Sequence, residues 1–148
     1  TMLYGSIETL EERIEHMIKL RNLQDETNGF QVFIPLAVQP IRKNAGIKRR
    51  TSAFDDLKTI AISRLMLDNF PHIKAYFITI GTQLTQLALT FGASDVHGTI
   101  LKERISHSAG ALTPEGLTRD ELIWLIKGAD RIPVERDTNY NEIQVYEN

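Results

Sequence analysis

The chain alternates between two hydrophobic patterns, and each change of pattern predicts a new structural element. Four short runs of apolar and β-branched residues are bounded by glycine, proline or polar residues, which is typical of strands buried in a sheet. These predicted strands cover residues 2–4, 30–36, 73–80 and 95–100. Between them, apolar residues recur every three to five positions, as on the buried face of a helix. The predicted helices cover residues 9–28, 52–71, 82–91 and 119–129.

Polar residues suited to capping stand at three of the predicted helix starts. Thr9 precedes Glu12 by three positions, and Thr118 precedes Glu121 by the same spacing. At this spacing each side chain can accept a hydrogen bond from the backbone N–H of the other residue. Ser52 can cap the second helix in the same way, with acidic residues in the first turn that complement the helix dipole. We therefore expect these three helix starts to be well defined.

The order of the predicted elements indicates the fold class. Strands that alternate with helices are typical of right-handed βαβ units on a parallel sheet, so we expect an α/β protein. A complete (β/α)₈ barrel takes about 250 residues. The 148 residues of this chain, with no linker or repeat between them, predict one domain with about four parallel strands. Because the first predicted strand starts at the first residues with nothing to cover its edge, we expect this unit to be part of a larger one.

Composition narrows the choice of partner. The net charge is −2 and the isoelectric point is about 6.1, whereas a nucleic-acid-binding domain is expected to be clearly basic. The sequence has no apolar run long enough to span a bilayer and no export signal at its start. We therefore expect a cytoplasmic protein that binds a small molecule or another protein. The chain has no cysteine, which removes disulfides, thiolate nucleophiles and thiolate-ligated metal clusters from its own chemistry.

Several motifs occur together in one order along the chain. They lie at residues 1–9, 21–35, 67–76, 109–111 and 133–138. In this order they resemble the radical S-adenosylmethionine enzymes of the futalosine route to menaquinone and their deazaflavin-forming relatives. The later motifs are similar to the aminofutalosine synthase branch in particular. Two positions differ from the family pattern, since Ser6 stands where histidine is usual and His97 where aspartate is usual.

The resemblance implies a fold and a reaction. It implies the C-terminal half of a TIM-type barrel, starting at about the fifth barrel strand. In this family the N-terminal half carries a three-cysteine loop that ligates a 4Fe–4S cluster, and the cluster binds S-adenosylmethionine. The implied transferase reaction adds a 5′-deoxyadenosyl radical to the enol ether of a carboxyvinyloxy-benzoate, an aromatic dicarboxylate, and loses carboxylate to give aminofutalosine.

The missing cysteines limit what this chain can do by itself. We expect it to be inactive alone, and either to self-associate or to need the N-terminal half, because half a barrel leaves strand edges and interior residues uncovered. The residues that we expect to be partly uncovered are Met2, Phe33, Ile34, Phe77 and Ile78. Two alternatives remain open: a radical enzyme of the dehypoxanthine futalosine cyclase type, and a half-barrel that binds a ligand or protein without catalysis.

Candidate site residues follow the predicted strand ends, because loops at the carboxyl ends of barrel strands meet at one mouth. We predict that Glu8 is catalytic, as an acceptor for a ribose hydroxyl or an amine, with support of the following helix as its alternative role. Tyr4 and Ser6 are predicted to bind the cofactor, with a turn residue as the alternative role of Ser6.

The predicted substrate-binding residues are Asp95, His97, Thr79 and Arg136. Asp95 and His97 lie two positions apart on one predicted strand, so their side chains face the same way. For Arg136 the alternative to a substrate contact is a local ion pair with Glu135 or Asp137 that holds the tail against the barrel. The basic segment 42–50 could attract a dicarboxylate or form a solvated loop. The histidines lack metal-ligand spacing, so we predict no metal site.

Overall fold

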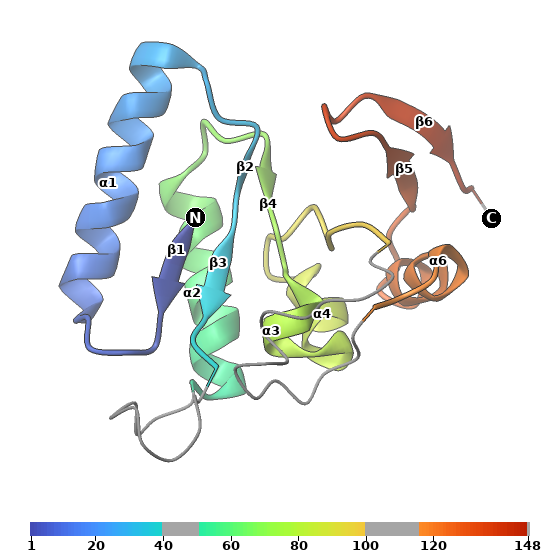
Figure 1. The fold of residues 1–148 in the computed structure, drawn as a ribbon, viewed down its shortest axis with the longest axis horizontal. Coiled ribbons are helices and arrows are strands. Elements are labelled where there is room, and N and C mark those ends of the chain that lie inside the picture. Colours follow the sequence, from blue (N-terminus) through green and yellow to red (C-terminus); the bar gives the residue numbers. More distant parts are fainter. Residues whose placement is uncertain (40–50, 100–115, 148) are drawn as a thin grey trace.

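The computed structural model describes residues 1–39, 51–99 and 116–147. Its helices are α1 (Leu10–Thr27), α2 (Ala53–Met66), α3 (Phe77–Ile80), α4 (Thr82–Ala88) and α6 (Arg119–Lys127). Its strands are β1 (Met2–Tyr4), β2 (Val32–Phe33), β3 (Pro35–Ala37), β4 (His72–Ile73), β5 (Val134–Arg136) and β6 (Glu142–Val145). Figure 1 shows α1 and α2 beside the strands, with α6 and the β5–β6 pair on the other side of β4.

The N-terminal strands form two parallel pairs. β1 pairs with β3, and β2 pairs with β4. A single parallel bridge joins Lys74, directly after β4, to Asp95. The strand arrowheads accordingly point the same way in Figure 1. The prediction of an α/β fold with parallel strands is confirmed at this level.

The two faces of these strands differ in burial. Met2 and Tyr4 of β1 are buried, as is Phe33 of β2, while Leu3 between the first two is 65% exposed. Contacts of α1 with β1, and of α2 with β3 and β4, place the two helices over the buried face. The expectation that Met2 and Phe33 would be uncovered is therefore wrong, because they face the helices and their neighbour Leu3 faces away.

The helix starts agree with the capping signals. The Thr9 hydroxyl accepts a hydrogen bond from the Glu12 N–H at 3.2 Å, and the Glu12 carboxylate accepts one from the Thr9 N–H at 2.7 Å. Thr118 and Glu121 repeat this reciprocal pair before α6. Ser52 caps α2 alone, through the N–H of Asp55. Among the helices of the described ranges, none is long and apolar enough to cross a bilayer.

The apolar run 73–80 is not one strand, and that prediction is wrong. β4 ends at Ile73, and Phe77 begins the short helix α3. Phe77 and Ile78 are fully buried, so the expectation that they would be uncovered is also wrong. An apolar run does not separate a buried strand from a buried helix, because both hide all their side chains. Gly81, at φ 83°, joins α3 to α4 in the left-handed region that favours glycine.

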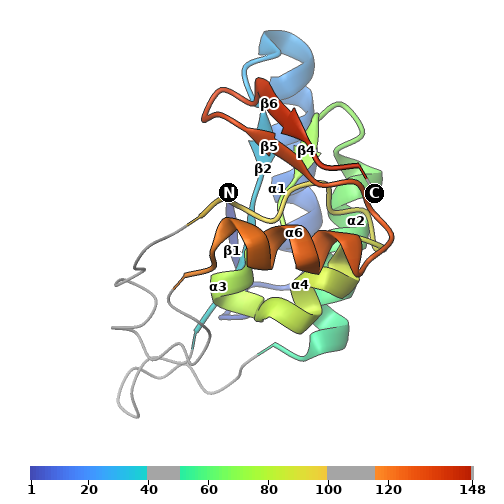
Figure 2. The ribbon, with the colours of Figure 1, turned by 90° about the vertical axis from the view of Figure 1, so that its right-hand side faces the viewer.

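The C-terminal tail forms an antiparallel hairpin of β5 and β6, where the sequence predicted only an extended tail. The hairpin lies beside the amino-terminal ends of β2 and β4. Gln31, just before β2, donates to the Asn139 carbonyl at 3.2 Å, and the His72 ring of β4 stacks on Tyr140 with centroids 4.5 Å apart. Figure 2 shows this hairpin above α6. The predicted strand 95–100 is reduced to the bridge at Asp95 as far as residue 99, and its last residue lies outside the described ranges.

Candidate functional site

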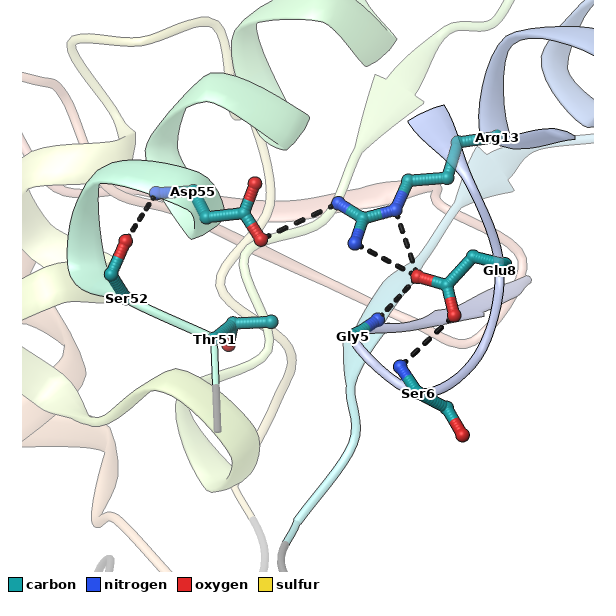
Figure 3. A pocket seen from close by; sticks show the side chains of 7 residues that line it. All are labelled: Gly5, Ser6, Glu8, Arg13, Thr51, Ser52 and Asp55. Atoms are coloured by element: carbon teal, nitrogen blue, oxygen red, sulfur yellow. Dashed lines mark hydrogen bonds and ion pairs between the residues drawn. The ribbon is translucent and has the colours of Figure 1, made fainter. Parts of the chain in front are cut away.

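A first cavity lies between the β1–α1 loop and the start of α2. It has a volume of about 360 Å³. Figure 3 shows the residues that line it, which are Gly5, Ser6, Glu8, Arg13, Thr51, Ser52 and Asp55. Two of the predicted site residues, Ser6 and Glu8, therefore lie in one cavity beyond the carboxyl end of β1, as expected from their place in the sequence.

Glu8 folds back over the loop that carries it. One carboxylate oxygen accepts the Gly5 N–H at 2.5 Å, and the other accepts the Ser6 N–H at 2.9 Å. The guanidinium of Arg13 reaches the first oxygen at 2.8 and 2.9 Å. Partial burial by itself would raise the pKa of Glu8, but these hydrogen bonds outweigh it and hold the pKa below its ordinary value. Glu8 is thus ionised and closes the loop through these hydrogen bonds. The sequence did not predict these contacts.

Arg13 joins this loop to the second helix. Besides Glu8, its guanidinium contacts the Asp55 carboxylate of α2 at 3.5 Å (Figure 3). It also donates to the Thr59 hydroxyl of α2 at 3.3 Å. It also lies 4.9 Å from the centre of the Tyr4 ring. The sequence analysis did not single out Arg13. Its position one turn into a capped helix, five residues after Glu8, could have indicated a contact between the two side chains.

Tyr4 has a different environment from the other residues of this group. Its side chain is fully buried, and its hydroxyl donates to the Asp56 carboxylate of α2 at 2.8 Å. Burial, followed by the negative charge of Asp56, raises the pKa of the Tyr4 phenol. In this structure Tyr4 connects β1 to α2, and its role in cofactor binding stays a prediction.

The second cavity lies between the segment after α4, helix α6 and the tail hairpin, and has a volume of about 560 Å³. Apolar residues of α6 and of segment 89–96 form part of its wall. Three of the predicted substrate-binding residues lie along it: Asp95, His97 and Arg136. The structure therefore brings together residues that are 41 positions apart in the sequence.

Asp95 is the centre of a buried charge network in this wall. Its carboxylate accepts hydrogen bonds from Arg136 at 2.9 Å and from the Tyr140 hydroxyl at 2.5 Å, and it forms an ion pair with Lys74 at 3.1 Å. Burial alone would raise the pKa of Asp95, but Tyr140 and the two cations outweigh it and lower the pKa. The alternative that Arg136 pairs with an acidic neighbour in the tail is wrong as to the partner, because its ion pair is with Asp95.

His97 is held from three sides. Its backbone N–H donates to the Asp95 carboxylate at 2.9 Å, and its Nδ1 lies 3.1 Å from the Lys74 ammonium. Its ring and the ring of Tyr76 pack edge to face, with centroids 4.9 Å apart. Its φ of 72° lies in the left-handed region, which costs a residue with a side chain free energy. Burial, and then the charge of Lys74, lower the pKa of His97, so the imidazole is neutral at pH 7.

The other predicted residues lie elsewhere. The Thr79 hydroxyl donates to the Tyr76 carbonyl at 3.1 Å, and the Thr79 carbonyl accepts the Gln39 amide at 2.8 Å. This connects the carboxyl end of β3 to α3. The basic segment 42–50 lies outside the described residues, so its attraction for a dicarboxylate stays a prediction. Within the described ranges, no three histidine or acidic side chains gather as a metal site would require.

Lys74 and Tyr140 complete the second group and were missed by sequence analysis. Lys74 lies inside an apolar run, where a lysine is unusual unless it is paired, and that signal was present in the sequence. Tyr140 gave no signal, because its contact with Asp95 depends on the hairpin that returns the tail to the sheet.

Comparison with known proteins matches nearly the whole chain to one family. The family described as CofH/MqnC C-terminal region matches residues 27–148. The aminodeoxyfutalosine synthase of Thermus thermophilus is 54% identical over 151 residues, and that of Streptomyces coelicolor is 44% identical over 158 residues. Each alignment covers 99% of this chain and 41% of the relative.

A second kind of relative matches over a similar extent. The 5-amino-6-(D-ribitylamino)uracil–L-tyrosine 4-hydroxyphenyl transferase of Methanococcoides burtonii is 40% identical over 151 residues, which cover 97% of this chain and 42% of that protein. The chain thus spans about two fifths of the length of the curated relatives it matches. With most of its length matched by one family description and nearly all of it by these relatives, the chain belongs to the CofH/MqnC C-terminal region family.

Proposed function

We propose that this chain forms the substrate-side, C-terminal part of a radical S-adenosylmethionine enzyme of the aminodeoxyfutalosine synthase type, within a TIM-type barrel. The observation that carries the proposal is the 54% identity to the Thermus thermophilus enzyme over 99% of this chain. The parallel pairs β1–β3 and β2–β4 support it, because parallel strands flanked by helices are the repeating unit of such a barrel.

The residues present do not fit a cluster site. An iron–sulfur cluster of this kind needs thiolate ligands, and the 148 residues include no cysteine. The described residues offer no group of three histidine or acidic side chains in their place. The proposed activity therefore requires that another polypeptide region supplies the cluster.

The first cavity suits a ligand that donates hydrogen bonds. Glu8 and Asp55 carry two negative charges against the single positive charge of Arg13. An excess of carboxylate over cation favours hydroxyl or ammonium groups, which are present on the ribose and amino-acid parts of S-adenosylmethionine. We assign Glu8 and Ser6 to the cofactor side of the proposed site for this reason.

The second group of residues suits an acidic ligand. Around neutral His97, Lys74 and Arg136 carry two positive charges against the single negative charge of Asp95. Elsewhere along the cavity, the charges of Arg119 and Arg131 are balanced by Glu135 and Glu142, so the excess of cation is local to His97. An excess of cation favours carboxylates, which the resemblance to the futalosine enzymes implies for the substrate. We assign His97, Asp95 and Arg136 to the substrate side.

A second candidate is the transfer reaction named for the Methanococcoides burtonii relative, which acts on 5-amino-6-(D-ribitylamino)uracil and L-tyrosine. The 40% identity over 97% of this chain favours it specifically. It ranks below the first candidate because the identity is lower over an equal extent.

A hybrid enzyme tests the proposal. The matching C-terminal region of the Thermus thermophilus relative is replaced by this chain, the cluster is reconstituted without oxygen, and both substrate sets are supplied with S-adenosylmethionine. We expect aminofutalosine from the carboxyvinyloxy-benzoate, and no product from the 148-residue chain alone. Formation of only the tyrosine-derived product would support the second candidate. A hybrid that holds its cluster and yields neither product would overturn both.

A further inference from the structure

We propose that Lys74 is a positioning residue that fixes His97 as the neutral tautomer protonated on Nε2, and that this N–H receives an anionic oxygen of a carboxylate ligand. The identity of the ligand rests on the proposed function, whereas the role of Lys74 does not. The inference starts from the contacts of the two side chains.

The first step concerns the charge of Lys74. Its ammonium forms an ion pair with Asp95 at 3.1 Å, and its side chain is only 6% exposed. The neighbouring carboxylate favours the charged ammonium, which has hydrogen-bond donors only. Nδ1 of His97, 3.1 Å from the same ammonium, must therefore be the acceptor. A neutral imidazole that accepts at Nδ1 carries its proton on Nε2.

The second step concerns the backbone of His97. A residue other than glycine at a φ of 72° is held there at a cost in free energy, and such residues cluster where a side chain must be placed. The hydrogen bond from the His97 N–H to Asp95 holds this conformation, and Asp95 also anchors Lys74. One carboxylate thus fixes both the backbone and the partner of the imidazole.

The third step concerns the free side of the ring. Nδ1 is engaged by Lys74 and the ring packs edge to face with Tyr76, while no described residue accepts a hydrogen bond from Nε2. His97 lines the 560 Å³ cavity, where Arg136 also lies. An ammonium on Nδ1 draws electron density from the ring and makes the N–H on Nε2 a stronger donor. Such a donor, close to two cations, selects an anionic oxygen and repels metal ions.

The tautomer can be measured on the chain itself, without turnover. Nitrogen-15 spectra that correlate the ring nitrogens with the ring protons distinguish the two neutral tautomers, and the His97→Gln variant identifies the signals. At pH 8 we expect His97 to show a protonated Nε2 and an unprotonated Nδ1. A mixture of tautomers, or a proton on Nδ1, would overturn the proposal.

Two variants separate the hydrogen bond from the charge. Lys74→Met removes a positive charge next to Asp95 and also removes the donor to Nδ1 of His97. Arg136→Met removes the other positive charge that pairs with Asp95 but leaves the donor to Nδ1 in place. We expect Lys74→Met to give a mixture of tautomers at His97 and Arg136→Met to keep the single form. His16, a histidine of α1 that contacts the Thr1 carbonyl, is the internal reference and should not change in either variant. Circular dichroism confirms that both variants fold. If Lys74→Met folds and keeps the single tautomer, Lys74 has no positioning role.

The ligand is tested with isophthalate, an aromatic dicarboxylate, as the probe. We expect a saturable shift of the His97 signals that Lys74→Met weakens by about tenfold, the loss of one charge-assisted hydrogen bond. The His97→Gln variant keeps a donor and should retain most of the binding, measured by calorimetry. Binding of Zn²⁺ at His97 in place of isophthalate, or no binding of isophthalate, would overturn the carboxylate assignment. Failure of the hybrid enzyme with an intact tautomer would overturn the proposed function and leave the role of Lys74 standing.

Discussion

Glu8 shows how a single carboxylate can serve a loop and a ligand together. It closes the turn after β1 through the N–H groups of Gly5 and Ser6, and it ties that turn to α1 through Arg13. Sequence reasoning offered two roles for Glu8, contact with a ligand and support of a helix through its dipole. The structure adds a third role, because four contacts converge on one side chain, and a charged group so engaged contributes more to stability than a dipole contact does.

The Glu8→Gln variant tests these roles in the hybrid enzyme and in the isolated chain. Charged hydrogen bonds contribute roughly 1.5–3 kcal/mol each, so we expect turnover to fall by about tenfold or more and the free energy of unfolding to fall by about 1.5–3 kcal/mol. Product formation and urea unfolding measure the two effects.

Glu12→Gln is the matched control for this prediction. Glutamine still completes the capping pair with Thr9, so neither turnover nor stability should change appreciably. A Glu8→Gln hybrid that is less stable but turns over normally would show that Glu8 only stabilises its loop. The catalytic assignment would then be withdrawn.

The limits of sequence reasoning at this scale follow from distance along the chain. Asp95 and His97 lie together in the structure, but not as neighbours on one face of a strand. His97 has a φ of 72°, and its backbone N–H donates to the Asp95 carboxylate, while Lys74 contacts both side chains. Tyr140 and Arg136 meet Asp95 from more than 40 positions away. No local pattern carries that information, since it depends on where the tail returns.

At the scale of elements, local capping signals predicted the helix starts correctly, whereas the apolar pattern did not separate a buried strand from a buried helix. The capping pairs define the starts of α1 and α6 because they are hydrogen bonds within one turn. The change from β4 to α3 within one apolar run was missed because complete burial removes the periodicity that separates the two structures. The hairpin of β5 and β6 was missed for another reason: its apolar residues are exposed, so it shows no core-facing pattern.

The attachment of this hairpin gives a prediction about elements. Asp95 holds it to the sheet through Arg136 and Tyr140, and it neutralises buried Lys74. Removal of one partner from a buried ion pair costs about 3–5 kcal/mol, so Asp95→Asn should lower the free energy of unfolding by that order. Hydrogen exchange should also become faster in β5 and β6. Denaturant unfolding and exchange measurements at pH 7 check both effects.

The dependence of this effect on pH has a fixed sign. The folded-state pKa of Asp95 lies below its ordinary value of 3.8, so its charge stabilises the fold fully above that pH. The difference between wild type and Asp95→Asn should therefore shrink as the pH falls below that value.

Asp68→Asn, which breaks the exposed pair with Arg21, is the control and should cost less than about 1 kcal/mol. Equal losses from the two variants would contradict the anchoring role.

At the scale of the whole molecule, one face of the parallel strands lacks a cover among the described residues. Helices α1 and α2 bury Met2, Tyr4 and Phe33, while Leu3 of β1 is 65% exposed and Ile7 after it is 96% exposed. Leu36 of β3 is paired in register with Leu3, so the two side chains share this face. In a closed barrel the corresponding face would be the packed interior.

Such a face predicts association in solution, since exposed apolar side chains on an open sheet favour pairing with another surface. We expect the isolated chain to form a dimer or larger species at a concentration of roughly 100 μM, where weak association becomes detectable by light scattering. Leu3→Lys should shift it towards the monomer, because the charge would have to be buried in the contact. Leu65→Lys, at a leucine of α2 that is 77% exposed, should leave the association unchanged. A wild-type chain that stays monomeric and binds no hydrophobic dye would contradict the prediction, and it would favour the alternative of a self-contained half-barrel that binds a ligand without catalysis.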